Sequence, residues 1–114
     1  MTDPYMTERL VQRDATILIN ETTSSAVDCI GVVPVALIVP VALTGTQLTA
    51  TASFDGSTYF DLYIDTSQWV QVLTGSTGYV AFDMSKMMGI RRIKFVSDSA
   101  ESAARTLNLI CRGI

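Results

Sequence analysis

The chain has 114 residues, of which 48% are hydrophobic and 17% are charged, and its formal net charge is −3. A chain of this length predicts one domain with its own core. Because the net charge is negative, the sequence lacks the excess of basic residues that is typical of nucleic-acid binding. The positive charges at Arg91, Arg92 and Lys94 are typical of a solvated strand face. Because the sequence contains no histidine, the common zinc sites and histidine-activated nucleophiles are excluded.

The first 13 residues are polar, contain Pro4 and show no regular period. We expect residues 1–13 to form an N-terminal arm ahead of a domain at 14–114, either as a disordered lead-in or as an extension onto a neighbouring subunit. In the second case Tyr5, Met6 and Leu10 would be its anchors. The arm lacks the apolar core of a secretion signal, so we expect a protein made in the cytoplasm.

Strands are predicted at 15–20 and 26–30, followed by an apolar segment at 30–43 that does not alternate. That segment is too short to cross a membrane. Two prolines, Pro34 and Pro40, cannot donate to a central ladder, so they indicate a strand at the edge of a sheet or lie at the ends of the strand. Its side chains need cover, which a loop of the same chain or a second copy could supply. A subunit interface would use Val33, Val35, Leu37 and Val39, and intramolecular packing is the alternative.

Residues 48–65 alternate on both sides of Asp55-Gly56, a pattern that predicts a β-hairpin. Leu48, Ala50, Ala52 and Phe54 on the first arm, with Phe60, Leu62 and Ile64 on the second, are expected to face the core. Gly56 suits the positive φ that such a turn requires.

The rest of the chain continues in short strands, predicted at 68–73, 79–82, 90–96 and 106–112. Between them, Asp83 fits a helix N-cap and Gly89 a helix end, which predicts one short helical turn near 84–88. Eight or nine short strands indicate an all-β protein. An antiparallel, jelly-roll-like β-sandwich is the first choice, and an immunoglobulin-like Greek key is the second.

No residues form a catalytic constellation. Asp55, Asp61 and Asp65 could offer oxygen ligands to calcium or a carboxylate pair to a glycosidase, but the turn and a polar strand face explain them. We therefore expect no enzyme, metal or cofactor. Cys29 and Cys111 are interpreted as buried free thiols, with a disulfide left open should their strands be neighbours.

Four aromatic residues could share a polar face: Tyr59, Tyr63, Trp69 and Tyr79. Such side chains are enriched in protein interfaces and also stack on sugars. A protein interface that includes Trp69, ordinary cover over a sheet edge, and a carbohydrate site all fit this pattern.

Two stretches, 53–63 (SFDGSTYFDLY) and 83–97 (DMSKMMGIRRIKFVS), resemble small proteins encoded by tailed bacteriophages. The resemblance covers roughly residues 15–112 and consists of turn, cap and strand residues. Met84 departs from it, because proline is frequent at that position. The resemblance implies a virion component with a β-sandwich fold and no catalytic residues.

Among virion components, the resemblance implies a capsid decoration, or cement, protein. Such proteins bind the outside of a phage head as homo-oligomers, often trimers, and fasten the major capsid protein or another virion protein. A head-spike base, tail or fibre connector module is one alternative. A carbohydrate-binding module is an alternative from another class. Neither nucleic acid nor a membrane is an expected partner.

Overall fold

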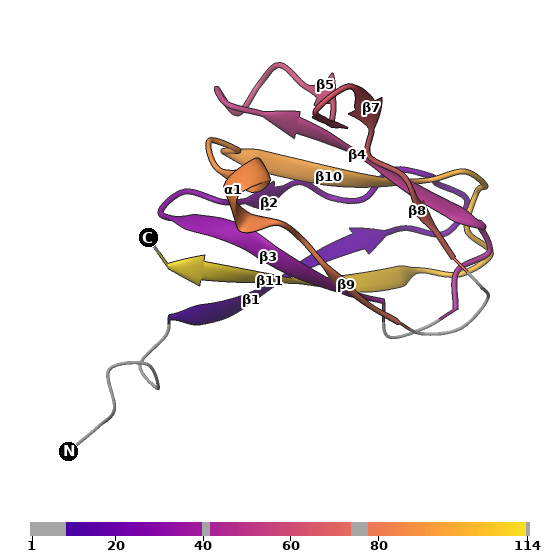
Figure 1. The fold of residues 1–114 in the computed structure, drawn as a ribbon. Helices are drawn as coiled ribbons and strands as arrows, with labels where there is room; N and C mark the ends of the chain where they lie inside the picture. The colour runs from indigo at the N-terminus through magenta and orange to yellow at the C-terminus, as the bar shows by residue number, and fades with distance from the viewer. Residues whose placement is uncertain (1–8, 40–41, 74–77, 114) are drawn as a thin grey trace.

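The computed structural model describes residues 9–39, 42–73 and 78–113. Within these ranges the chain forms eleven strands and one short helix (Figure 1). They are β1 (Leu10–Ile17), β2 (Val27–Asp28), β3 (Val32–Val39), β4 (Gln47–Ser53), β5 (Phe60–Asp61), β6 (Tyr63–Ile64), β7 (Ser67–Gln68), β8 (Gln71–Val72), β9 (Gly78–Ala81), α1 (Met84–Met87), β10 (Arg92–Ser97) and β11 (Arg105–Gly113).

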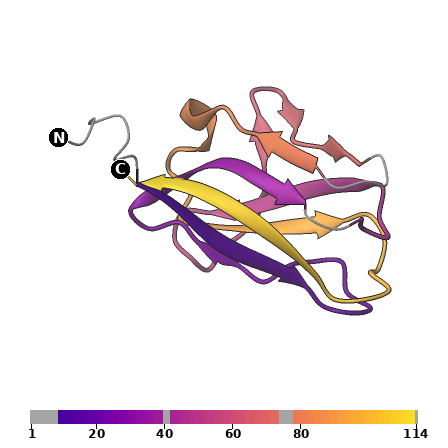
Figure 2. The same ribbon diagram turned by 90° about the horizontal axis from the view of Figure 1, so that it is seen from below.

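The strands pair as though the chain were first folded into one long hairpin and then rolled up. From the outside inward, β1 pairs with β11, β2 with β10, β3 with β9, and β4 with β5, all antiparallel. Rolling this hairpin gives two sheets of order β1-β11-β3-β9 and β2-β10-β4-β5, which face each other (Figures 1 and 2). This nested pairing is that of a jelly roll. The predicted jelly-roll β-sandwich is confirmed, as is the helical turn near 84–88.

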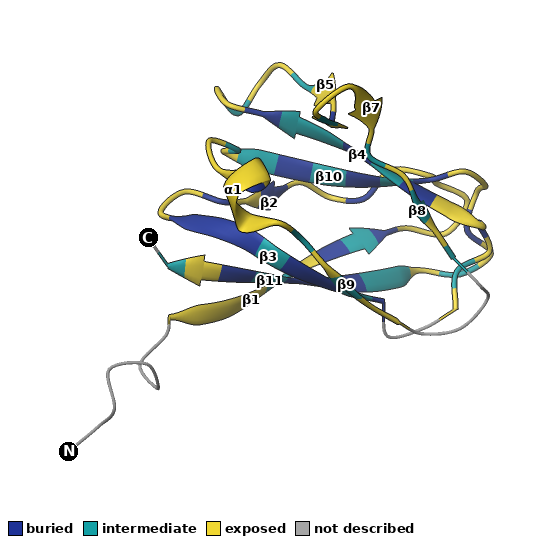
Figure 3. Ribbon diagram, in the orientation of Figure 1, coloured by how far each residue is buried: buried dark blue, intermediate teal, exposed yellow. Residues whose placement is uncertain are grey.

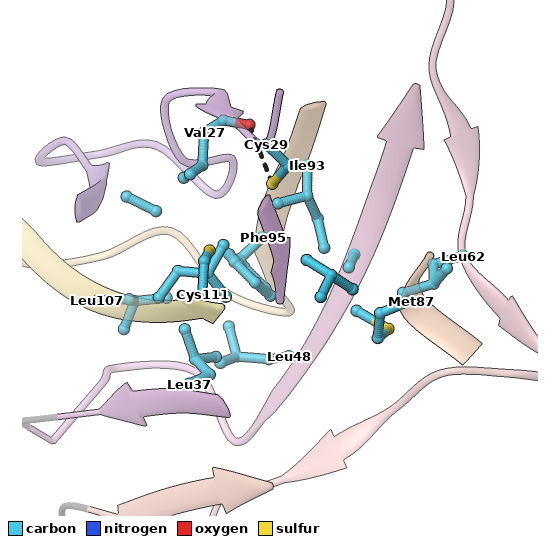
Figure 4. Close-up of a cluster of buried hydrophobic side chains, with 14 of the residues drawn as sticks. Val27, Cys29, Leu37, Leu48, Leu62, Met87, Ile93, Phe95, Leu107 and Cys111 are labelled. Carbon is cyan, nitrogen blue, oxygen red and sulfur yellow. Dashed lines mark hydrogen bonds between the residues drawn. The ribbon is translucent and has the colours of Figure 1, made fainter. Parts of the chain in front are cut away.

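The core lies between the two sheets and follows strand alternation. On β10 every second side chain is buried, including Ile93 and Phe95. Leu107 and Leu109 of β11 and Leu37 of β3 belong to the same cluster and come from the opposite sheet. Figure 4 shows Leu37 and Leu107 near Phe95. Buried residues occur along the strands of both sheets (Figure 3).

The apolar segment 30–43 corrects a prediction, because β3 lies inside its sheet, between β11 and β9. Pro34 pairs with Cys111, beside a register shift that falls between Ile110 and Cys111, and a bulge is one place where a sheet accepts a residue without an N–H. β9 pairs only with residues 36–39 of β3, and α1 contacts β3 as well. The chain itself therefore covers this strand. Pro40 lies outside the described residues.

The predicted hairpin forms, but its loop is wider than the Asp55-Gly56 pair. Ala52 lies opposite Phe60, so residues 53–59 make the connection. Gly56 has φ +84°, as expected. The Asp55 carboxylate accepts hydrogen bonds from the backbone N–H groups of Thr58 and Ser57, both at 2.8 Å. These bonds lower the pKa of Asp55 to about 2.

The first strand also begins earlier than predicted. β1 starts at Leu10 and pairs with β11 along its whole length, from Leu10 opposite Arg112 to Ile17 opposite Arg105. Residues 10–13, which the sequence assigned to the N-terminal arm, thus belong to the sheet.

A buried carboxylate fastens two loops at one end of the sandwich. Glu101 is almost inaccessible to solvent, and it accepts hydrogen bonds from the backbone N–H groups of Thr44 and Gly45 at 2.8 and 3.1 Å. The Ser97 hydroxyl and the Arg105 guanidinium also donate to it, at 2.9 and 3.2 Å. Burial alone raises the pKa of Glu101, but these hydrogen bonds outweigh it and leave that pKa below its usual value.

Replacing this carboxylate is expected to destabilise the fold. In Glu101→Gln, the amide NH2 is itself a donor and would face the groups that now donate to the carboxylate. We therefore expect the free energy of unfolding, measured in urea at pH 7, to fall by about 2 kcal/mol. Because the folded pKa is lowered, the carboxylate stabilises the fold above its ordinary pKa and loses that effect as the pH falls through the folded value. The difference in the free energy of unfolding between the original protein and Glu101→Gln should therefore shrink as the pH falls. Glu21→Gln, at an exposed glutamate, is the control, and an equal loss in both variants would contradict this role.

Cys29 and Cys111 are free, buried and part of the same core cluster. Cys29 follows β2 in one sheet, and Cys111 lies on β11 in the other. The contact with the Cys111 thiol, together with burial, raises the pKa of the Cys29 thiol above its usual value. The neutral Cys29 thiol is therefore a poor nucleophile. The same contact lowers the pKa of the Cys111 thiol, but that thiol is fully buried and so shielded from reagents.

We expect a thiol reagent at pH 8 to modify the folded protein slowly and to find both thiols after denaturation. Cys29→Ala, as the control, should yield one thiol under the same denaturing conditions. Protein purified without reductant that shows no thiols when unfolded would instead indicate a disulfide between the two sheets.

Candidate interaction surface

The structure separates the residues predicted to form an interface. Val33, Leu37 and Val39 are buried in the core of the sandwich, and Val35 is half-buried against it. They are part of the hydrophobic interior, so packing inside the domain accounts for their apolar character. Leu10 is exposed on β1. Tyr5 and Met6 lie outside the described residues.

Trp69 belongs with the core as well. Its ring makes edge-to-face contacts with Phe82 and Phe95, with centroids 5.6 and 6.1 Å apart, an arrangement that aromatic pairs favour. Tyr59 lies elsewhere, beneath the Lys94 ammonium at 4.2 Å, and Tyr79 is on β9 of the other sheet. The aromatic residues therefore do not gather into one platform, contrary to that interpretation.

A different group of apolar side chains is exposed, around α1. Phe54 is 74% exposed, Phe60 62%, Met88 58% and Met84 38%. We call these four residues the α1 surface. α1 and the loop between β4 and β5 lie toward the same end of the sandwich, on the left of Figure 1. Large exposed apolar side chains grouped in this way are typical of a surface that meets another molecule.

Sequence reasoning missed this surface for an identifiable reason. Phe54 and Phe60 continue the alternation of β4 and β5, so they were expected to face the core. However, the pairing of β10 with β4 ends at Ser53, so Phe54 lies just beyond the paired part of β4. Phe60 lies on β5, the outermost strand of its sheet, and both phenylalanine rings are exposed to solvent. The methionines that follow Asp83 were the feature of the sequence that could have pointed to this surface.

α1 is held firmly against the sandwich although it has only four residues. The Asp83 carboxylate caps it by accepting a hydrogen bond from the Ser85 N–H at 3.1 Å. Lys86 forms an ion pair of 2.9 Å with Asp65, and Asp65 raises the pKa of Lys86. Met87 is buried at the end of the core that also holds Leu62 (Figure 4). The helix thereby holds Met84 and Met88 in the solvent.

Three shallow hollows border α1. The one toward β4 and β5 has a volume of about 300 Å³ and is lined in part by Phe54, Phe60 and Met88. A second, of about 170 Å³, lies between Trp69, Asp83 and Lys86. The third, of about 100 Å³, is lined by Val33, Met84, Met88, Arg112 and Gly113, and we call it the Met84 hollow.

The side chains around α1 are suited to contact with another molecule. Methionine adapts its shape to different partners, and exposed phenylalanine offers a large apolar area. Among the described residues, no group of three or more His, Cys, Asp or Glu side chains could hold a metal ion. Across the same ranges, no helix has the length and apolar character needed to span a membrane.

No protein-family model matches the chain, and no curated protein matches it in sequence. Solved structures do resemble it in fold. The SPBc2 prophage-derived protein YomS has a TM-score of 0.53 at 13% identity, over 91% of this chain and 95% of that one. The fold of YomS is therefore similar.

Two looser similarities have TM-scores below 0.5, and neither supports an argument about this chain. CBM32-1, from a family 31 glycoside hydrolase of Clostridium perfringens, has a TM-score of 0.49 at 13% identity, over 98% of this chain and 100% of that one. The Yersinia pseudotuberculosis-derived mitogen has a TM-score of 0.37 at 13% identity, over 94% and 87% of the respective chains.

The two kinds of aromatic position should respond differently to truncation. Trp69→Ala removes a side chain packed against two rings, so we expect it to cost about 2 kcal/mol or more in the free energy of unfolding. Phe60→Ala removes an exposed ring and should change that free energy by no more than about 0.5 kcal/mol. Urea unfolding followed by circular dichroism measures both. Equal losses would contradict the distinction between core and surface.

Proposed function

We propose that this protein is a non-enzymatic structural component of a phage virion, and that it is a capsid decoration protein. It would bind the outside of the assembled head through the α1 surface and fasten neighbouring capsid subunits. The observation that carries the proposal is the exposed cluster of Phe54, Phe60, Met84 and Met88 on a compact jelly roll. The fold likeness to a prophage-derived protein supports a phage setting, and the virion would be its location.

The physical mechanism is mass action. A protein that binds only the assembled shell lowers the free energy of that state and leaves free subunits unaffected. Burying two phenylalanine and two methionine side chains would provide apolar area for such contacts. The rigid attachment of α1, through Asp83 and the ion pair of Lys86 with Asp65, would reduce the entropy lost on binding.

A connector in the head-spike base, tail or fibre is the second candidate, because the α1 surface would suit it equally well. The copy number in purified particles separates the two. A number matched to the subunits of the shell supports decoration, and a number matched to a single vertex or tail supports a connector.

Loss of the two phenylalanine rings of the α1 surface is expected to weaken capsid binding. Phe54→Ser combined with Phe60→Ser should lower co-sedimentation with mature heads of the phage that encodes the chain by at least about tenfold. Tyr79→Ser, which alters an exposed aromatic on β9, is the matched control and should bind as the original does. Circular dichroism should show that both variants are folded.

Removing residues 1–8 leaves β1 intact and tests the role of the predicted arm in the same assay. We expect reduced occupancy of heads. Full occupancy by the truncated protein would remove the arm from shell binding, and full occupancy by the double phenylalanine variant would overturn the proposed role of the α1 surface.

A further inference from the structure

We infer that Arg91, Arg92 and Lys94 form a binding site for an acidic segment of a partner protein, and we call these three residues the β10 site. The segment would lie extended along β10, on the outer face of the sheet β2-β10-β4-β5, with its carboxylates against the three cations. The β10 site shares no residue with the α1 surface, so it stands apart from the proposed function.

The two arginines converge on one point of the loop between β4 and β5. Gly56 has no side chain, and the place where its Cβ would stand is 3.5 Å from Arg91 Nε and 3.8 Å from Arg92 Nε. Neighbouring residues of a strand point to opposite faces, but Arg91 precedes β10, which begins at Arg92. The Arg91 N–H donates to the Ser53 carbonyl at 2.8 Å. Both guanidinium groups therefore lie beside the same loop.

Lys94 joins the site through strand alternation. Ile93 and Phe95 are buried in the core, so Arg92 and Lys94 point to the outer face of the sheet. Two-residue spacing on a strand separates their Cα atoms by roughly 7 Å. The Lys94 ammonium lies 4.2 Å from the centroid of the Tyr59 ring, and this cation–π contact holds the charge in place.

The cations of the β10 site have no carboxylate partner within the described part of the chain, where no ion pair involves them. Asp28 lies opposite Arg92 in the sheet, but its carboxylate accepts a backbone N–H hydrogen bond at 2.8 Å. Hydrogen bonds within its own loop, and no guanidinium, lower the pKa of Asp55. Asp61 is separated from Lys94 by a residue of β4. The three positive charges are therefore available to another molecule.

One atom of the site has an unmet hydrogen bond. Arg92 Nε is buried and has no partner among the described residues. A buried donor without a partner costs about 1–3 kcal/mol, and such a group in a folded protein calls for an explanation, of which a bound ion is one. The terminal nitrogens of the same guanidinium are not buried in this way. A carboxylate that approaches them from outside would form charge-assisted hydrogen bonds, which offset the cost at Nε.

The spacing of the site favours a row of carboxylates over a single small anion. Alternate residues of an extended peptide have the same separation as Arg92 and Lys94, and the planar guanidinium fork matches the two oxygens of a carboxylate. The site also contains three of the eight Lys and Arg residues of a chain whose net charge is −3. An acidic partner would therefore be attracted here and repelled by much of the remaining surface.

A synthetic peptide of alternating glutamate and threonine tests the inference on the full chain, with binding followed by fluorescence anisotropy. At about 20 mM salt, where charges are weakly screened, we expect saturable binding. Arg92→Gln and Lys94→Gln should each weaken it by at least about threefold. Arg9→Gln removes the same charge from an exposed arginine ahead of β1, beside the other sheet. It is the matched control and should bind as the original does.

Three outcomes would overturn the inference: no saturable binding of the glutamate peptide, equal losses in Arg9→Gln and in the two site variants, or equal binding of a peptide with glutamine in place of glutamate. Inorganic phosphate that displaces the peptide at the peptide's own concentration would also overturn it, and would indicate a site for a small anion. Circular dichroism should show that all variants are folded. The assay contains no capsid and leaves the α1 surface unchanged, so failure here and failure of shell binding can be told apart.

Discussion

The closure of two sheets over one thin core constrains everything else in this molecule. Phe95, a fully buried residue of the sheet β2-β10-β4-β5, shares this core with Leu37 and Leu109 of the other sheet. Nested antiparallel pairing brings β1 to β11 and β3 to β9, so residues far apart in the chain must meet for the core to exist. The loops are positioned by this closure and by polar ties such as the one at Glu101.

α1 closes the sandwich and also supports its most distinctive surface. β9 pairs with only half of β3, and the short helix next to it buries Met87 in the core. Because Met84 and Met88 flank that buried anchor, they are held outward. The pairing of β10 with β4 ends at Ser53, just before Phe54, and Phe60 lies on β5 at the edge of the same sheet. The exposed apolar group is thus a consequence of where the two sheets end.

Much of the fold could be predicted from local pattern. The turn at Gly56, the cap at Asp83 and the alternation along β10 all depend on residues close in sequence. The set of interface residues could not be predicted in this way. Val33, Leu37 and Val39 have the same apolar side chains whether a sheet or a second subunit covers them, and alternation continues through Phe54 and Phe60 although the core does not.

The sequence by itself determined the class of the protein, a β-sandwich with one short helical turn. Strand alternation, turn residues and helix caps are local and act wherever they occur. Only the tertiary structure decided which apolar residues are core and which are surface. That decision depends on which strands become neighbours and on where their pairing shifts, as beside Pro34, or stops, as at Ser53. These are properties of contacts between distant segments, and no single stretch of the chain contains them.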